Sequence, residues 1–103
     1  MYETKHKHIF AGYLMEIVAY TLPGCSHCKT LKELFKRAKT DYTEVVVKRD
    51  MSLDEFESLF PGVNMFPFVV VDGKQIGGLV DAVKLFVKEG LVTSSKNKND
   101  SSN

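Results

Sequence analysis

The chain has 103 residues, of which 44% are hydrophobic and 26% are charged, and its formal net charge is +1. These values are typical of one globular domain with a modest core, and they exclude nucleic acid or a membrane surface as a partner held by bulk electrostatics. No apolar run approaches the ~20 residues that span a bilayer, and two cysteines are too few for a secreted disulfide scaffold.

The sequence divides into three parts. Residues 1–14 fit no periodic template, and we predict a flexible N-terminal extension there, before Met15 opens a compact strand. Residues 93–103 are polar and low in complexity, which predicts a disordered tail. The domain itself is expected at residues 15–92. The N-terminus lacks the order of segments found in a signal peptide, so we expect a cytoplasmic protein.

The first elements of the domain are a strand, a turn and a helix. The run "EIVAY" is a short apolar strand that ends at the turn "TLPG". From Cys25 onward, apolar residues recur at helical spacing, and the same helix carries lysines on its other positions. The apolar face consists of Cys28, Leu31, Leu34, Phe35 and Ala38.

A second strand and a second helix follow. "DYTEVVVK" is rich in β-branched residues, which favours a strand. "SLDEFESLF" begins with Ser52 and Glu55, which have the spacing of a capping box and predict a helix start. We expect this helix to bury Leu53, Phe56, Leu59 and Phe60.

The last elements are a hairpin and a helix. "FPFVVVDGKQIGG" predicts two strands joined by the Asp72–Gly73 turn. "LVDAVKLFVKEG" predicts a helix that stops near Gly90 and buries Leu79, Val83, Phe86 and Val87. The order βαβαββα, with its right-handed βαβ connection, predicts an α/β fold with a four-stranded mixed sheet and helices on both faces.

Both cysteines lie where the first strand turns into the first helix. Unpaired backbone N–H groups and the positive end of the helix macrodipole favour a thiolate at Cys25, and Lys29 adds to that field. Cys28 follows three residues later on the apolar face, where it can attack a mixed disulfide formed at Cys25. Pro23, Gly24, Ser26 and His27 complete the predicted active-site loop, in which His27 tunes the redox potential.

The cysteine pair has two other interpretations. A zinc site of two cysteines and two histidines would have to recruit His6 and His8 from the N-terminal extension. The cysteines could also be inert packing residues. A CxxC pair at a strand-to-helix turn in a βαβ context favours the redox interpretation, with no obligatory metal.

Three motifs in order make the domain similar to the glutaredoxins, a family with the thioredoxin fold. "YTLPGCSHC" resembles the family's YTKPxCPYC, "MFP" falls where the family has TVP, and "IGG" matches the family's IGG before the last helix. The resemblance implies a cis bond before Pro67, with the backbone of Phe66 presented to a peptide or to glutathione. It also implies glutathione contacts at Gly77, Gly78 and the following turn, where Val80 replaces the family's acidic or hydroxyl residue and Asp81 is a substitute.

The sequence also departs from the family at the other end of the expected glutathione site. Leu22 and Asp54 stand where a basic residue and a glutamine often bind the glycine carboxylate, and Asn64 replaces an occasional basic residue. Lys29, Lys48 and Arg49 are the candidates to replace that charge. A lost charge-assisted contact costs about 1.5–3 kcal/mol of binding.

The leading hypothesis is a monomeric, glutathione-dependent thiol–disulfide oxidoreductase that reduces protein disulfides or glutathione mixed disulfides. The first alternative is a glutaredoxin-like redoxin that is reduced by thioredoxin reductase and serves ribonucleotide reductase. The second is an iron–sulfur cluster carrier, in which Cys25 and glutathione ligate the cluster between two protomers. Ser26 fits the carrier, whereas a weak glutathione site argues against it.

Overall fold

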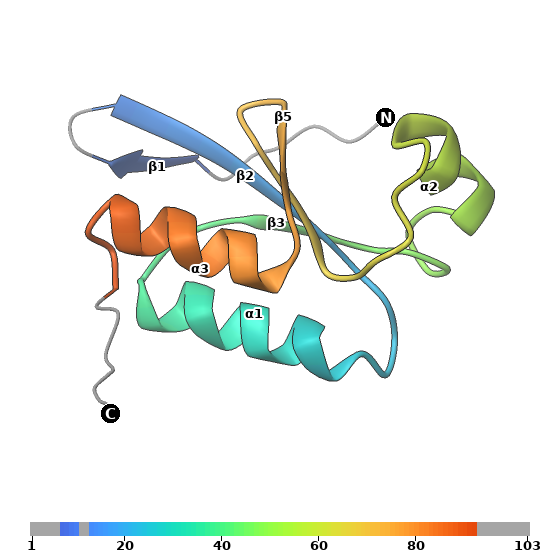
Figure 1. Ribbon diagram of the computed structural model, residues 1–103, viewed down its shortest axis with the longest axis horizontal. Coiled ribbons are helices and arrows are strands. Elements are labelled where there is room, and N and C mark those ends of the chain that lie inside the picture. The colour runs from blue at the N-terminus through green and yellow to red at the C-terminus, as the bar shows by residue number, and fades with distance from the viewer. Residues whose placement is uncertain (1–6, 11–12, 93–103) are drawn as a thin grey trace.

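The computed structural model describes residues 7–10 and 13–92, which form eight elements (Figure 1). In chain order these are β1 (Lys7–Phe10), β2 (Tyr13–Thr21), α1 (Ser26–Arg37), β3 (Thr43–Val46), α2 (Leu53–Leu59), β4 (Phe68–Val71), β5 (Lys74–Gly77) and α3 (Leu79–Lys88). None of the helices in this described part has both the length and the apolar character needed to cross a membrane.

The strand β2 lies at the centre of a mixed sheet. It pairs in parallel with β3, from Val18 opposite Thr43 onward, and antiparallel with β4, where Ile17 lies opposite Val71. The strand β5 returns beside β4 through the Asp72–Gly73 turn, in which both residues have positive φ, the geometry of a tight hairpin turn. The predicted four-stranded mixed sheet is therefore confirmed, in the order β3-β2-β4-β5.

The structure differs from the sequence-based prediction at the start of the domain. β1 pairs antiparallel with the first residues of β2, with Lys7 opposite Glu16 and Phe10 opposite Tyr13, and makes the sheet five-stranded. The strand that we predicted to open at Met15 begins at Tyr13, two residues earlier, and the domain bounds stay a prediction. A four-residue strand that pairs along one partner gives too few positions for a period to be visible. Residues 1–6, 11–12 and 93–103 lie outside the described residues, so the predicted flexibility and disorder there stay predictions.

Alternate residues of the strands build two cores on opposite faces of the sheet. Ile17, Ala19 and Val69 point to the face covered by α1 and α3, whereas Tyr20 and Phe68 point to the face covered by α2. Figure 1 shows α1 and α3 side by side, with α2 apart from them at the other end of the molecule. The prediction of helices on both faces is thus confirmed.

The helices also follow the expected boundaries, but their buried faces are narrower. The Ser52–Glu55 capping box is present, yet of the four apolar residues expected in the core only Phe56 is fully buried, while Leu53 and Leu59 are exposed. In α3 the buried residues are Ala82 and Phe86, and Val83 is exposed. The two-turn helix α2 and the helix α3, which packs over β4 and β5, each bury one stripe, so apolar neighbours of that stripe remain in solvent.

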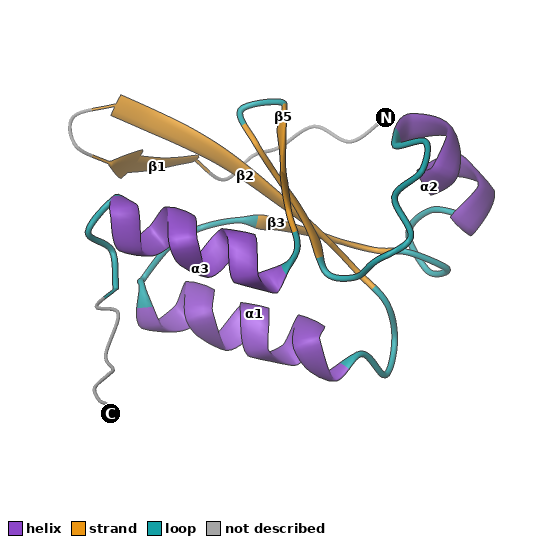
Figure 2. Ribbon diagram, in the orientation of Figure 1, coloured by secondary structure: helices purple, strands orange, loops and turns teal. Residues whose placement is uncertain are grey.

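Three chain segments meet at one end of the sheet and position the site (Figure 2). The end of β2 lies beside the start of β4, with Tyr20 opposite Phe68, and the end of β5 pairs with β4 through Gly77 and Val69. The segments that leave this end carry both cysteines, the Phe66–Pro67 bond and the start of α3.

Candidate active site

Cys25 is the N-cap residue of α1. Its φ of −87° and ψ of 115° are extended, and its Sγ accepts the backbone N–H of Cys28 at 3.2 Å. The Cys25 N–H donates in turn to the carbonyl of Leu22 at 3.3 Å, which closes the turn after β2. The sulfur therefore does what a serine or aspartate oxygen does at other helix starts. Its side chain is partly exposed, so a substrate disulfide can reach the sulfur.

The Phe66–Pro67 segment faces this sulfur. The peptide bond between the two residues is cis, as the resemblance implied. The Cys25 thiol donates a weak hydrogen bond to the Phe66 carbonyl, with 3.7 Å between the sulfur and the oxygen. Pro67 itself is buried. The first cysteine is thus held between a helix terminus and a backbone carbonyl from a distant part of the chain.

Cys28 has different surroundings. Its side chain is buried, with a relative exposure of 2%, and both thiols are free. Burial, followed by the hydrogen bond to Cys25, raises the pKa of Cys28 from 9.0 to about 12. A backbone hydrogen bond at Leu22 and the charge of Lys32 act in the opposite direction. At neutral pH Cys28 is therefore a protonated, sheltered thiol.

A groove of about 640 Å³ opens beside the two cysteines. Most of the residues predicted for the active-site loop line it: Pro23, Gly24, Cys25, Ser26, Cys28 and Lys29. His27 is exposed on α1 but is not among the lining residues. Of the three cations expected to replace the missing charge, Lys29 and Arg49 line this groove, and Lys48 lines a different hollow next to α2.

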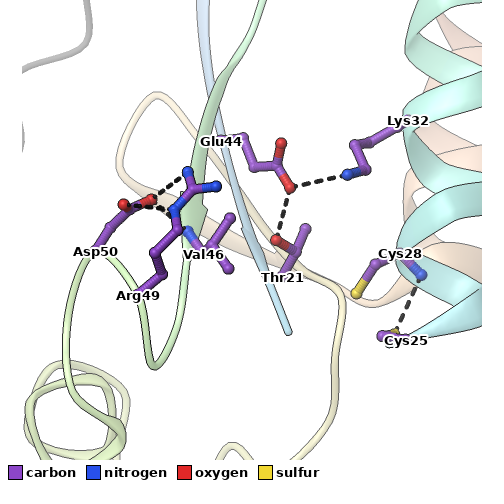
Figure 3. A network of polar contacts seen from close by, with 8 residues as sticks. All are labelled: Thr21, Cys25, Cys28, Lys32, Glu44, Val46, Arg49 and Asp50. Atoms are coloured by element: carbon purple, nitrogen blue, oxygen red, sulfur yellow. Dashed lines mark hydrogen bonds and ion pairs between the residues drawn. The ribbon is translucent and has the colours of Figure 1, made fainter. Parts of the chain in front are cut away.

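The groove is also lined by three polar residues that the sequence analysis did not select: Thr21, Lys32 and Glu44. The Thr21 hydroxyl donates to Glu44 Oε2 at 2.7 Å, and Lys32 Nζ lies 3.2 Å from the same oxygen (Figure 3). Arg49 makes two hydrogen bonds to Asp50, at 3.0 and 3.1 Å. The position of Lys32 beside Cys28 was predictable from the sequence, because it follows Cys28 by four residues and residues at that spacing are neighbours on a helix. Nothing in the sequence of β3 indicates that Glu44 contacts Thr21 and Lys32.

The glycine pair before α3 allows two close approaches. Gly77 has a φ of 125°, and a Cβ there would collide with the Asp81 carboxylate. Asp81 caps the helix by accepting the Gly78 N–H at 3.2 Å. A Cβ on Gly78 would lie 3.1 Å from the Met65 sulfur and 3.6 Å from the Pro67 oxygen. These residues therefore lie together beside the Phe66–Pro67 bond, whereas Val80 is exposed.

No cluster of three or more metal-ligating side chains occurs within residues 7–10 and 13–92. The two-cysteine, two-histidine alternative needs His6, which lies outside the described residues, and the side chain of His8, which is not described either.

Comparison with known proteins gives one family. The glutaredoxin family model matches residues 17–76. The chain is 36% identical over 81 residues to glutaredoxin-C5, chloroplastic, of Arabidopsis thaliana. That match covers 73% of this chain but only 45% of the relative, so the chain spans less than half the length of the protein it resembles.

Solved structures agree in fold. The holo form of glutaredoxin C1 from Populus tremula x tremuloides is 25% identical, with a TM-score of 0.58 over 70% of this chain and 74% of that one. The buckwheat glutaredoxin–glutathione complex is 21% identical, with a TM-score of 0.63 over 75% of this chain and 72% of that one. Members of the family are thiol–disulfide oxidoreductases. By its family model and its fold, this chain belongs to the glutaredoxin family.

Proposed function

We propose that this chain is a dithiol thiol–disulfide oxidoreductase that uses glutathione as its reductant. The observation that carries the proposal is the asymmetry of the cysteine pair: a partly exposed Cys25 at a helix N-terminus and a buried Cys28 whose backbone contacts the first sulfur. Thiol–disulfide exchange uses such a pair in two steps, attack by the accessible sulfur and resolution by the sheltered one.

The chemistry in each step follows from this arrangement. The Cys25 thiolate attacks one sulfur of a substrate disulfide, the substrate S–S bond breaks, and the other sulfur leaves with the electron pair. Cys28 then attacks Cys25, releases the second substrate sulfur as a thiol, and closes the Cys25–Cys28 disulfide. Two molecules of glutathione reduce that disulfide and become one oxidised glutathione. The proposed setting is the reducing cytosol, where both thiols persist between turnovers.

Glutathione is favoured as the reductant for two reasons. The buckwheat glutaredoxin was solved as a glutathione complex, so the fold shared by the two chains is able to hold this ligand. In this chain the Phe66 carbonyl faces Cys25. Asp81 lies in the first turn of α3, where it accepts the Gly78 N–H, and its carboxylate suits an amino group of the ligand. Lys29, Lys32 and Arg49 are the cations that line the groove and could meet its carboxylate.

A second candidate is a redoxin reduced by thioredoxin reductase, and one observation favours it. Leu22 lines the groove at the position where the family often has a basic residue, and Arg49 is already paired with Asp50. A chain that does not use glutathione has no need of a free cation there. In this case the clients include disulfides such as that of ribonucleotide reductase.

The two candidates differ in which reductant supports turnover. We would follow reduction of a glutathionylated peptide with glutathione and glutathione reductase in one reaction and thioredoxin reductase in the other, with Cys25→Ser as the blank. Turnover in the first reaction is expected. Turnover in the second reaction alone would mean that thioredoxin reductase, and not glutathione, is the reductant. No turnover in either reaction would favour the iron–sulfur carrier.

A gain-of-charge variant sharpens this test. Leu22→Lys restores the family's basic residue in the groove, and a charge-assisted hydrogen bond of about 1.5–3 kcal/mol lowers KM for the glutathionylated peptide by one to two decades. The matched control is Leu59→Lys, which places the same charge on an exposed leucine of α2, outside the groove. An unchanged KM in Leu22→Lys would mean that the peptide's glutathione does not lie in this groove.

A further inference from the structure

A chain of polar contacts runs through the groove wall beside the resolving cysteine. It begins at Thr21, which is 2% exposed at the end of β2, passes through Glu44 on β3 and ends at Lys32 on α1. Figure 3 shows the Lys32 ammonium directed from α1 toward the Glu44 carboxylate, above the space between Thr21 and Cys28. Residues of three separate elements are therefore linked, and Glu44 is the one that contacts the ammonium group.

This ammonium lies on the Cys28 side of the helix. Lys32 follows Cys28 by four residues, so the two side chains are neighbours on the surface of α1. Both line the same groove. The Lys32 side chain is 43% exposed, and the Glu44 oxygen at 3.2 Å is its ion-pair partner on the groove wall.

Cys28 needs such a charge in the second step. Only a thiolate attacks a disulfide efficiently, and Cys28 is a buried thiol with a pKa raised to about 12. Among the groups that share its groove, Cys25 opposes ionisation, whereas a backbone hydrogen bond at Leu22 and, as the smaller contribution, the charge of Lys32 favour it. The remaining charged groups there are Lys29 on its own helix, Glu44 on β3, and Arg49 after β3, the last of which is bound to Asp50.

We propose that Lys32, held by Glu44 and Thr21, is a positioning residue that stabilises the negative charge on Cys28 as it attacks the Cys25 mixed disulfide. This inference rests on the proposed dithiol function. In that step the Cys28–Cys25 S–S bond forms and the bond between Cys25 and the substrate sulfur breaks. The substrate sulfur leaves with the electron pair and takes up the proton that Cys28 loses, so no further reactant is needed.

A neutral chromogenic disulfide, dithiodipyridine, separates the two steps in one stopped-flow trace. Attack by Cys25 releases the first pyridinethione, and resolution by Cys28 releases the second. Lys32→Gln removes the charge, Lys32→Arg keeps it, and Lys84→Gln makes the same change on an exposed lysine of α3, outside the groove. Because the probe is uncharged, loss of a lysine does not change its electrostatic attraction to the groove.

We expect Lys32→Gln to slow the second phase and leave the first unchanged. For each unit by which the Cys28 pKa rises, the thiolate fraction falls tenfold while its nucleophilicity rises about threefold, so the net loss is roughly three- to fourfold. The rising limb of the second-phase pH profile moves to higher pH, Lys32→Arg restores the rate, and Lys84→Gln matches the wild type.

Three results would overturn the inference. One is a second phase that Lys32→Gln leaves unchanged, and another is an equal loss in Lys32→Arg, which would indicate a packing role. The third is an equal slowing of both phases, which would indicate a general effect on the site. A wild-type chain that shows no first phase would refute the proposed dithiol function itself, and the inference with it.

Discussion

Cys25 and Cys28 are three residues apart on one helical turn, but their surroundings differ. Cys25 lies partly exposed between the start of α1 and the Phe66 carbonyl. Cys28 is buried against a wall that carries Thr21, Glu44 and Lys32. One short motif therefore contains two unlike thiols. Backbone groups contact the first thiol, Cys25. Burial raises the pKa of the second, Cys28, and the Thr21–Glu44–Lys32 contacts lie beside it.

The largest expected effect comes from removing either sulfur. Cys25→Ser abolishes all turnover, because no other accessible thiol exists in a chain with two cysteines. Cys28→Ser removes protein-disulfide reduction, since nothing resolves the mixed disulfide internally, but it retains turnover of a glutathionylated peptide in which external glutathione resolves. Coupled assays with both substrates check this. Equal loss of both activities in the two variants would contradict the division of roles.

Alkylation of the reduced, folded chain tests the same difference without turnover. Iodoacetamide is expected to modify Cys25 at pH 7 at least ~50-fold faster than Cys28, because raising the pKa from 9.0 to about 12 removes most of the thiolate and burial limits access. Peptide mass spectrometry at timed intervals gives both rates. In denaturant the two rates should become similar, and similar rates in the folded chain would contradict the account.

The glycine pair beside Phe66–Pro67 predicts a change in stability. Gly77→Ala places an L residue at a φ of 125° and pushes the Asp81 carboxylate away from the Gly78 N–H that it caps, and we expect a loss of about 2 kcal/mol in the free energy of unfolding. Gly62→Ala is the matched control, because Gly62 also has positive φ, but no atom lies within 4 Å of a Cβ there. Urea denaturation of both variants compares the two sites, and a loss in Gly77→Ala no larger than that in Gly62→Ala would contradict the prediction.

The smallest expected effect is a pH dependence of stability. Burial raises the pKa of Cys28, so as pH rises above 9 the unfolded chain loses this proton before the folded chain does. The folded state then binds more protons, and stability falls with pH. Between pH 8 and 9.5 the reduced wild type should lose about 1 kcal/mol more than Cys28→Ala, as measured by urea denaturation. Parallel curves for the two chains would show that burial does not perturb this thiol.

Much of the fold was predictable because the local signals are strong. The Ser52–Glu55 capping box, the Asp72–Gly73 turn and the β-branched strands each determine their element through nearby residues. β1 was missed, since four residues that pair along one neighbour show no period. Leu53, Leu59 and Val83 were expected to be buried, but their exposure depends on how much of each helix the sheet covers, which local spacing does not specify.

The site, like the fold, has a part that the sequence predicts and a part that it does not. Both cysteines and the loop around them could be predicted from one contiguous motif, and the cis bond before Pro67 followed from the family resemblance. The Thr21–Glu44–Lys32 contacts could not be predicted, because they join three elements whose register only the folded sheet sets. Likewise, sequence alone could not separate Arg49, which lines the groove, from its neighbour Lys48, which does not.

The most direct test of the central claim is to trap the first intermediate. The Cys28→Ser chain would be mixed with a glutathionylated peptide in the absence of free glutathione, and the adduct located by peptide mass spectrometry. The account predicts a mixed disulfide on Cys25, and no adduct on Cys28 when Cys25→Ser is treated in the same way. An adduct that forms on Cys28 in Cys25→Ser, or no adduct in either variant, would contradict the assignment of Cys25 as the attacking thiol.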